Sequence, residues 1–306
     1  MIKPVAVTIK DKERFELCRD AFYKSLGHGN YISDLCFSNL LAWGESIKTR
    51  RVFAGRFCCV SVEFAGKLYR YAPLGPLDPL ELYENFIEEF YAVKEEKGEK
   101  IELIMIPEAL LPALRKLNNF TAEYSYDEAY SDYLYENASF LNLLDNASNR
   151  YDYNYFVRNH APYFRLIDGS TKADCLKIMD KFWCSRRDCG DCHFGCERKA
   201  LQSALTHFDA LDLSGALVYA GREPAAFVVA KHLNPEVIAY SFLKSDRHMR
   251  GLQVFLLVSF AREVHKEAEK INFTEDMGVA GLRLFKRRLA PFTQIHKYNI
   301  ILTRTH

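Results

Sequence analysis

The chain of 306 residues carries 41 Lys and Arg against 40 Asp and Glu, and 49% of its residues are hydrophobic. This composition excludes an intrinsically disordered chain and is typical of a globular protein with one or two domains. No run approaches the roughly 20 apolar residues of a membrane-spanning helix, and the first residues lack the apolar core of a signal peptide. The sequence therefore predicts a soluble cytoplasmic protein.

The charge is divided unevenly along the chain. Residues 1–149 carry 17 Lys and Arg against 23 Asp and Glu, whereas residues 150–306 carry 24 against 17. An anionic partner would bind the basic second half, although a solvated surface explains the same excess equally well.

The first half predicts helices, then extended segments, and then alternating helices and strands. Apolar spacing and turn residues place them as follows: helices at 11–27 and 33–47, extended segments within 52–74, a helix at 81–96, a strand at 101–106, a short helix at 107–117 and strand at 121–136.

The second half repeats this order without repeating the letters. Two helices precede three strands joined by tight turns, and a long helix, a strand, a short helix and a last strand follow. The predicted ranges are 171–183, 196–208, 213–221, 225–233, 237–245, 250–270, 271–275, 279–289 and 294–303. The repeat indicates two copies of one α/β unit, at 1–150 and 151–306, with the active cleft in the second.

The stretch INFTEDMGVAGLRLFKRRLAP at 271–291 joins an apolar run to an acidic pair, two glycines and a basic helix. Either carboxylate, Glu275 or Asp276, is a candidate general base, with Asp276 slightly favoured, and capping of the helix is the alternative. Gly278 and Gly281 allow close backbone approach or a positive φ, and a plain turn would explain them as well.

The helix that ends this stretch combines an apolar side with a basic one. Leu282, Phe285 and Leu289 are interpreted as the apolar side, and Lys286 is placed with the arginines on the basic side. That side is either solvated or in contact with phosphate or nucleic acid.

Together with SFLKSDRHMRGL and the helix that begins at Glu197, this stretch resembles the bacterial family related to the C-terminal domain of phosphatidylglycerol lysyltransferase. The matching residues in the stretch are Asn272, Glu275, Asp276, Gly278, Gly281, Leu282, Lys286 and Pro291. The resemblance covers nearly the whole chain, including SDLCFSNLLAWGESIK and YSDYLYENASFL. It implies a tandem pair of domains similar to the GNAT (acyl-CoA N-acyltransferase-like) fold, each a mixed, mostly antiparallel sheet flanked by helices.

The resemblance also implies substrate-binding residues. Lys244, Arg247, Arg250 and Gly251 lie between the third strand and the long helix, where GNAT enzymes hold the coenzyme A pyrophosphate. The usual spacing of that loop is not reproduced here, because His248 and Gln253 stand at two of its positions. Acetyl-CoA therefore lacks motif support, and aminoacyl-tRNA or another activated donor stays open.

Arg158 and Asn159 match an Arg-Asn pair of the family, but the Gly-Lys-Lys stretch that usually precedes the pair is missing. A basic channel built by that segment is therefore in doubt.

The segment CSRRDCGDCHFGC offers soft metal ligands, namely Cys184, Cys189, Cys192 and Cys196 with His193. Zinc or an iron–sulfur cluster is an alternative, but a single continuous loop differs from the paired segments of structural zinc sites, which favours unligated thiols. No metal is assigned.

Two functions follow. The first is a transferase that moves an acyl or aminoacyl group from a coenzyme A thioester or aminoacyl-tRNA to an amine or hydroxyl acceptor, with contact to a lipid head group at a surface left open. The second is a noncatalytic GNAT-derived module that binds tRNA or a small anion.

Overall fold

The computed structural model describes residues 3–27, 31–64, 66–91, 100–186 and 195–305. Contacts between Cα atoms divide the chain into two compact units, and each unit is built from segments that are separated in the sequence. The first unit contains residues 1–132, 275–280 and 294–306, and the second contains residues 133–274 and 281–293. A domain boundary between residues 150 and 151 was expected from the internal repeat. It stays a prediction.

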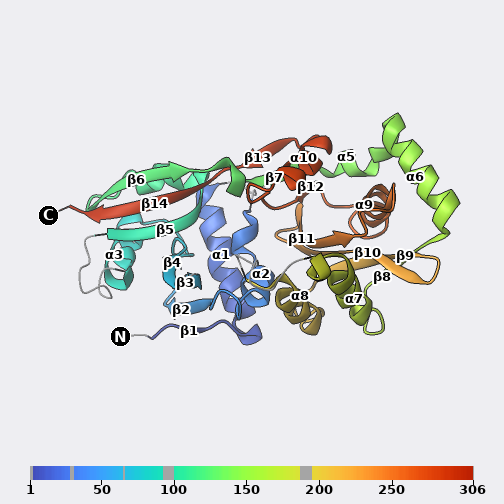
Figure 1. Cartoon of the computed structure of the whole chain (residues 1–306). Helices are drawn as coiled ribbons and strands as arrows, with labels where there is room; N and C mark the ends of the chain where they lie inside the picture. The colour runs from blue at the N-terminus through green and yellow to red at the C-terminus, as the bar shows by residue number, and fades with distance from the viewer. Residues whose placement is uncertain (1–2, 28–30, 65, 92–99, 187–194, 306) are drawn as a thin grey trace. The chain divides into compact units, whose positions relative to one another are not determined.

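The first unit is built on a seven-stranded sheet in the order β1-β2-β3-β4-β5-β14-β6. Its elements are β1 (Val5–Ala6), α1 (Lys12–Leu26), α2 (Phe37–Ala42), β2 (Arg50–Ala54), β3 (Phe57–Phe64), β4 (Lys67–Arg70), α3 (Leu80–Tyr91), β5 (Lys100–Pro107), α4 (Leu111–Leu114), β6 (Phe120–Tyr126) and β14 (Lys297–Arg304). Figure 1 shows β14, in red, running between β5 and β6. It pairs antiparallel with both.

The second sheet also has seven strands, in the order β13-β7-β12-β11-β10-β9-β8. Its strands and helices are β7 (Asp132–Glu136), α5 (Asn137–Leu141), α6 (Ala147–His160), β8 (Pro162–Leu166), α7 (Lys172–Phe182), α8 (Glu197–Thr206), β9 (Ser214–Ala220), β10 (Glu223–His232), β11 (Val237–Ser245), α9 (Leu252–Glu263), β12 (Lys270–Asn272), α10 (Ala280–Arg288) and β13 (Thr293–Ile295). The pairing of β11 with β12 is parallel, and β8 to β11 form an antiparallel series.

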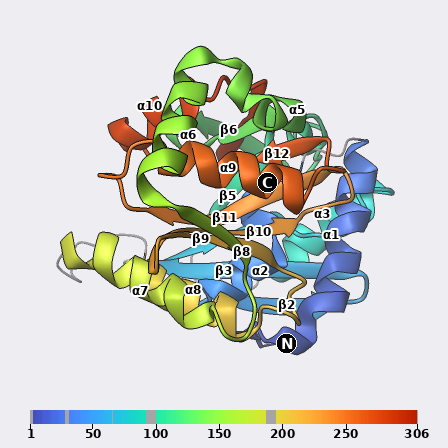
Figure 2. The same cartoon turned by 90° about the vertical axis from the view of Figure 1, so that its right-hand side faces the viewer.

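The core of the second unit lies between this sheet and α9. Residues 225–231 of β10 are all buried, because helices cover both faces of this central strand. Leu252, Leu256 and Phe260 of α9 are buried in the same cluster. Figure 2 shows α6 beside α9, and the two helices are in contact.

The predicted fold class is confirmed, since each unit has a mixed sheet flanked by helices. The order of three strands, helix, strand and helix is also present in the second unit as β9, β10, β11, α9, β12 and α10.

Several element predictions differ from the structure. The last strand, expected at 294–303, is two strands, and they belong to different sheets. The long helix expected at 250–270 ends at Glu263, and the strand expected at 271–275 ends at Asn272. No helix was predicted at 147–160, where α6 forms because Asn146 caps it by accepting the N–H groups of Ser148 and Asn149.

Candidate functional site

The stretch after β12 is a strained turn. Thr274 has φ +56 and Met277 has φ +54, values in the left-handed region that a β-branched threonine rarely adopts. In the second unit, Asn272 Oδ1 accepts the Thr274 N–H at 2.9 Å, and the Thr274 carbonyl accepts the Tyr133 N–H at 3.0 Å. These bonds hold Thr274 in a conformation that it would otherwise leave.

Lys286 braces this turn from inside the second unit. Its side chain is 2% exposed, and Nζ donates to the carbonyls of Phe273 at 2.5 Å and Thr274 at 3.1 Å. The same ammonium lies 5.5 Å from the centre of the Tyr133 ring and 5.4 Å from that of Phe273. The carbonyl oxygens and ring faces together stabilise a buried cation.

The interpretation of Lys286 as part of a basic side is therefore wrong. Lys286 lies four residues after Leu282 and three before Leu289, so helical spacing places it on the face that these leucines share. Its side chain is buried there and does not face solvent.

A second buried lysine lies in the first unit, where it contacts a cluster of carboxylates. Lys297 Nζ lies 2.6 Å from Asp34, 2.8 Å from Asp132 and 3.3 Å from Glu275. Asp132 also accepts hydrogen bonds from the backbone N–H and hydroxyl of Ser33, at 2.7 and 2.9 Å. We call Asp34, Asp132, Glu275 and Lys297 the acid–lysine cluster.

The acid–lysine cluster has a closed side and an open side. The side chains of Lys297 and Asp132 are fully buried, whereas those of Asp34 and Glu275 are 15% and 24% exposed. We call the partly exposed Asp34 and Glu275 the open side of the cluster, and the fully buried Lys297 and Asp132 its closed side.

The cluster carries more negative than positive charge, and this sets its protonation. Burial raises the pKa of Asp34 to about 7; Lys297 opposes the rise, and the charges of Glu275 and Asp132 add to it. Burial alone would lower the pKa of Lys297, but Asp132, Asp34 and Glu275 hold it well above its usual value. Lys297 therefore stays charged at neutral pH, and Asp34 exchanges a proton there.

The two carboxylates predicted as general bases separate. Glu275 joins the acid–lysine cluster, whereas Asp276 is fully buried and its Oδ1 accepts the Gly278 N–H at 2.8 Å. The Asp276 carbonyl accepts the Val279 N–H at the entry to α10. Asp276 therefore takes part in the turn, as the capping alternative expected.

The two predicted glycines also differ. Gly278 has φ +73, in the left-handed region that glycine favours. Gly281 lies within α10, and an added Cβ there would meet nothing within 4 Å. Only Gly278 has the positive φ expected of the pair.

Gly251, at the start of α9, is required by the protein's own packing. Its φ is +84, and a Cβ there would lie 2.0 Å from the carbonyl oxygen of Asp152 in α6. Arg250 pairs with the same Asp152 at 2.7 Å and stacks over Tyr151. In this structure α6 covers the start of α9.

The other residues predicted to contact a donor are not members of the acid–lysine cluster. Lys244 pairs with Glu197 at 2.7 Å, and Arg247 is exposed in the loop before α9. Arg158 and Asn159 donate to carbonyls one turn earlier in α6. The segment 187–194, with Cys189, Cys192 and His193, lies outside the described residues, so the cysteine prediction stays open; Cys184 and Cys196 are half-buried.

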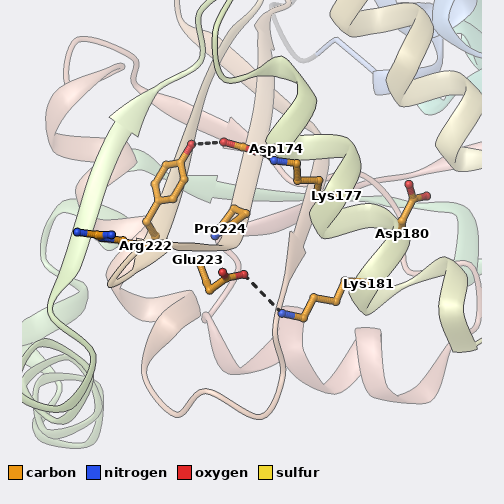
Figure 3. Close-up of a pocket in the computed structure, with 8 residues that line it drawn as sticks. Asp174, Lys177, Asp180, Lys181, Arg222, Glu223 and Pro224 are labelled. Atoms are coloured by element: carbon orange, nitrogen blue, oxygen red, sulfur yellow. Dashed lines mark hydrogen bonds and ion pairs between the residues drawn. The ribbon is translucent and has the colours of Figure 1, made fainter.

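A cavity of about 640 Å³ lies in the second unit, between α7 and the turn from β9 to β10. Figure 3 shows Lys181 facing Glu223, and their charged atoms lie 3.9 Å apart. The Tyr219 hydroxyl donates to Asp174 at 2.7 Å. Lys177 also pairs with Asp174. This surface hollow has matched charges and contains none of the predicted site residues.

These features define a class of protein. Two mixed sheets with flanking helices, in this strand order, form the tandem GNAT fold. The solved tandem GNAT protein from the clavulanic acid biosynthesis pathway is similar to this chain. The TM-score is 0.50 at 9% identity, over 99% of this chain and 98% of that one. Within the described residues no helix is both long and apolar enough to cross a bilayer.

The chain belongs to the family described as phosphatidylglycerol lysyltransferase, C-terminal, whose model matches residues 28–301. A conserved protein of unknown function from Bacteroides thetaiotaomicron VPI-5482 is similar at 24% identity, with a TM-score of 0.84 over 99% of this chain and all of that one. L-PGS from Bacillus licheniformis is similar at 14% identity, with a TM-score of 0.64 over 99% of this chain and 94% of that one. No curated protein sequence matches.

The sequence reasoning missed Asp34, Asp132 and Lys297. Their signal was present but weak: Lys297 alternates with Ile295 on the inward side of the last strands, where an apolar residue is expected. A lysine at such a position requires an acidic partner, but the spacing along the chain does not say which one.

Proposed function

We propose that this protein transfers an activated acyl or aminoacyl group, carried by aminoacyl-tRNA or a coenzyme A thioester, to an amine or hydroxyl acceptor. The family supports the reaction class. The observation that carries the proposal is the open side of the acid–lysine cluster, where Glu275 and Asp34 are partly exposed and the pKa of Asp34 is raised to about 7. A carboxylate that exchanges a proton near neutral pH suits general base catalysis.

In the proposed reaction, the lone pair of the acceptor nitrogen or oxygen attacks the carbonyl carbon of the donor ester or thioester. Glu275 or Asp34 takes the proton that the nucleophile loses. The carbonyl then re-forms, the bond to the donor oxygen or sulfur breaks, and the same carboxyl returns the proton to that leaving group. Lys297 does not take a proton, because the three carboxylates keep it charged.

The three cations predicted to contact donor phosphates differ in whether they already pair with a carboxylate. Arg247 is exposed, whereas Lys244 and Arg250 pair with Glu197 and Asp152. A phosphate that bound Lys244 or Arg250 would have to displace these carboxylates. We therefore assign the donor contact to Arg247 first.

The same pairings favour the second function, a noncatalytic module that binds tRNA or a small anion. If Asp276 only closes the turn and the cations only join elements of the fold, the chain retains the architecture of a transferase without its chemistry. The two functions differ in what Glu275 and Asp34 do.

The test measures transfer from labelled aminoacyl-tRNA, acetyl-CoA and a longer acyl-CoA to amine and hydroxyl acceptors. The transferase function predicts product formation that rises with pH through about 7, as Asp34 loses its proton. It also predicts that Glu275→Gln and Asp34→Asn each reduce the rate, by about 100-fold for whichever residue is the base.

Glu88→Gln is the matched control. Glu88 belongs to the same unit, its side chain is 21% exposed, and it pairs with Arg304, so the change removes a comparable charge away from the cluster. Binding of a donor in a thermal-shift experiment, with no product and no effect of Glu275→Gln, would favour the binding module. No donor binding at all would contradict the transferase function and the binding of tRNA by the module.

A further inference from the structure

Among the described residues the two sheets end in four strands, and β6 differs from the other three. β1 has two residues and β13 has three, and such short strands offer little for another strand to pair with. β8 begins with Pro162, which has no N–H to donate. β6 has seven residues, FTAEYSY, without proline or lysine. Figure 1 shows β6 on the outer side of β14. β6 is therefore the sheet edge best able to accept another strand.

The backbone of β6 alternates between groups that bond to β14 and groups that point outward. The Thr305 N–H donates to the Asn119 carbonyl at 2.9 Å, and β14 continues in this register along β6. Because the N–H and C=O groups of an antiparallel strand alternate between its two sides, the odd-numbered residues of β6 bond to β14. The even-numbered residues direct their N–H and C=O groups to the outer edge: Phe120, Ala122, Tyr124 and Tyr126.

The side chains of β6 leave this edge accessible. Thr121, Glu123 and Ser125 are exposed, and Glu123 is the one charged residue of the strand. Tyr126, at the end of β6, is 44% exposed, and its hydroxyl lies 3.0 Å from His296 Nδ1. The Tyr126 ring also packs against the Tyr298 ring, with the ring centres 5.3 Å apart. The edge therefore combines outward backbone groups with short polar side chains and one fixed aromatic ring.

A second copy of β6 fits the edge best in one antiparallel register. Outward groups must meet outward groups, so the twofold axis of a well-overlapped pair lies beside Ala122, Glu123 or Tyr124. An axis beside Glu123 places two carboxylates opposite each other, which is unfavourable. An axis beside Ala122 places two small side chains opposite each other. An axis beside Tyr124 instead places Ala122 opposite the large Tyr126 of the other copy, and Glu123 opposite Ser125, whose hydroxyl can donate to it.

We propose that β6 pairs antiparallel with β6 of a second copy of this chain, about a twofold axis beside Tyr124. The pairing joins the first sheets of two copies through about six backbone hydrogen bonds, made by residues 122, 124 and 126 of each copy. A separate peptide could supply such bonds, but the matches of Ala122 with Tyr126 and of Glu123 with Ser125 come from the chain's own sequence. The inference is independent of the proposed transfer reaction, because no residue of the acid–lysine cluster belongs to β6.

The first test is sedimentation velocity of the full chain between about 1 and 100 µM, a range suited to a small interface. We expect a monomer–dimer equilibrium without larger species, because a twofold pair uses the edge of both copies. Ala122→Pro removes an outward N–H and leaves the hydrogen bonds to β14 in place. Since symmetry removes two hydrogen bonds from the dimer, we expect this change to weaken dimerisation by about 30-fold.

The register is tested by two opposite substitutions at Ser125. Ser125→Lys places an ammonium opposite Glu123 of the other copy, and Ser125→Glu places a carboxylate there. We expect the lysine to strengthen dimerisation by about fivefold and the glutamate to weaken it by about as much. Both changes are on an exposed side chain, so they decide the question even if Ala122→Pro does not fold.

Leu166→Pro is the matched control. The Ile167 N–H donates to the Gly215 carbonyl of β9, so the Leu166 N–H points to the outer edge of β8, and its loss should leave dimerisation unchanged. Thermal unfolding of each variant shows whether it is folded. A wild-type chain that stays monomeric to about 100 µM, growth beyond the dimer, or a dimer that folded Ala122→Pro does not weaken would overturn the proposal. So would equal effects of the two Ser125 variants, or a dimer that Leu166→Pro weakens as much.

Discussion

Each unit of this protein contains a buried lysine, and the two are stabilised by different chemistry. Lys297 in the first unit is surrounded by Asp34, Asp132 and Glu275, whereas Lys286 in the second donates to two backbone carbonyls and lies over two aromatic rings. Carboxylates titrate, and carbonyls and rings at neutral pH do not. A lysine held by acids therefore makes a pH-sensitive centre, while a lysine held by the backbone fixes a turn.

The largest effect is expected for Lys297→Met. Removing the ammonium leaves the carboxylates of the cluster buried beside one another, at a cost of about 4 kcal/mol in the free energy of unfolding. The pKa of Asp34 is already raised from 3.8 to about 7, and it should rise further without Lys297. A carboxyl with a raised folded pKa contributes stability below its unfolded pKa and loses it as pH rises. Urea unfolding should therefore show the variant closest to wild type in acid and falling behind as pH rises through about 7.

A smaller effect, less dependent on pH, is expected for Lys286→Met. Methionine fills the volume and packs against the rings of Tyr133 and Phe273, but the carbonyls of Phe273 and Thr274 lose a donor. We expect a loss of about 2 kcal/mol in the free energy of unfolding. Urea titrations at the same pH values as for Lys297→Met should show a difference from wild type that changes less with pH than the difference for Lys297→Met. A difference that grows as strongly with pH would indicate that Lys286, too, is held mainly by acids.

The smallest effect, and the one of opposite sign, is expected for Thr274→Gly. Glycine adopts the observed φ of +56 without the penalty of a β-branched residue, so the free energy of unfolding should rise by less than about 1 kcal/mol after the entropy cost of glycine. Thr121→Gly in β6, where the backbone is extended, should instead destabilise the protein. Calorimetry of the two variants gives this comparison, and destabilisation by Thr274→Gly would show that the Thr274 side chain matters more than its backbone strain.

Local patterns predicted much of the fold. The strands and helices from β9 to α10 follow from alternating apolar residues, tight turns and helical spacing, and the family could be named from the stretch at 271–291. The helix α6 was missed because Tyr151, Tyr153 and Tyr155 alternate along it as in a strand, although the cap at Asn146 was visible in the sequence. A cap can therefore outweigh an aromatic pattern.

The candidate site was predicted only in part, for reasons of distance along the chain. Glu275 was singled out by its position after an apolar run, but its partner Lys297 and the acids Asp34 and Asp132 lie in other segments. The misplacement of Lys286 was avoidable, since its spacing from Leu282 and Leu289 already indicated the inner face. Periodicity says which residues are buried, and only the tertiary structure says which of them meet.

Because β14 lies between β5 and β6, the first sheet is completed only after nearly the whole chain has been synthesised. Tyr298 pairs with Ile106 on one side and Tyr126 on the other, so the first sheet joins residues separated by most of the chain. On the ribosome, the strands of the first unit emerge early but wait for β14 until the whole second unit has been made. The edges of β5 and β6 that β14 covers stay unpaired during that time, and unpaired strand edges of this kind favour aggregation.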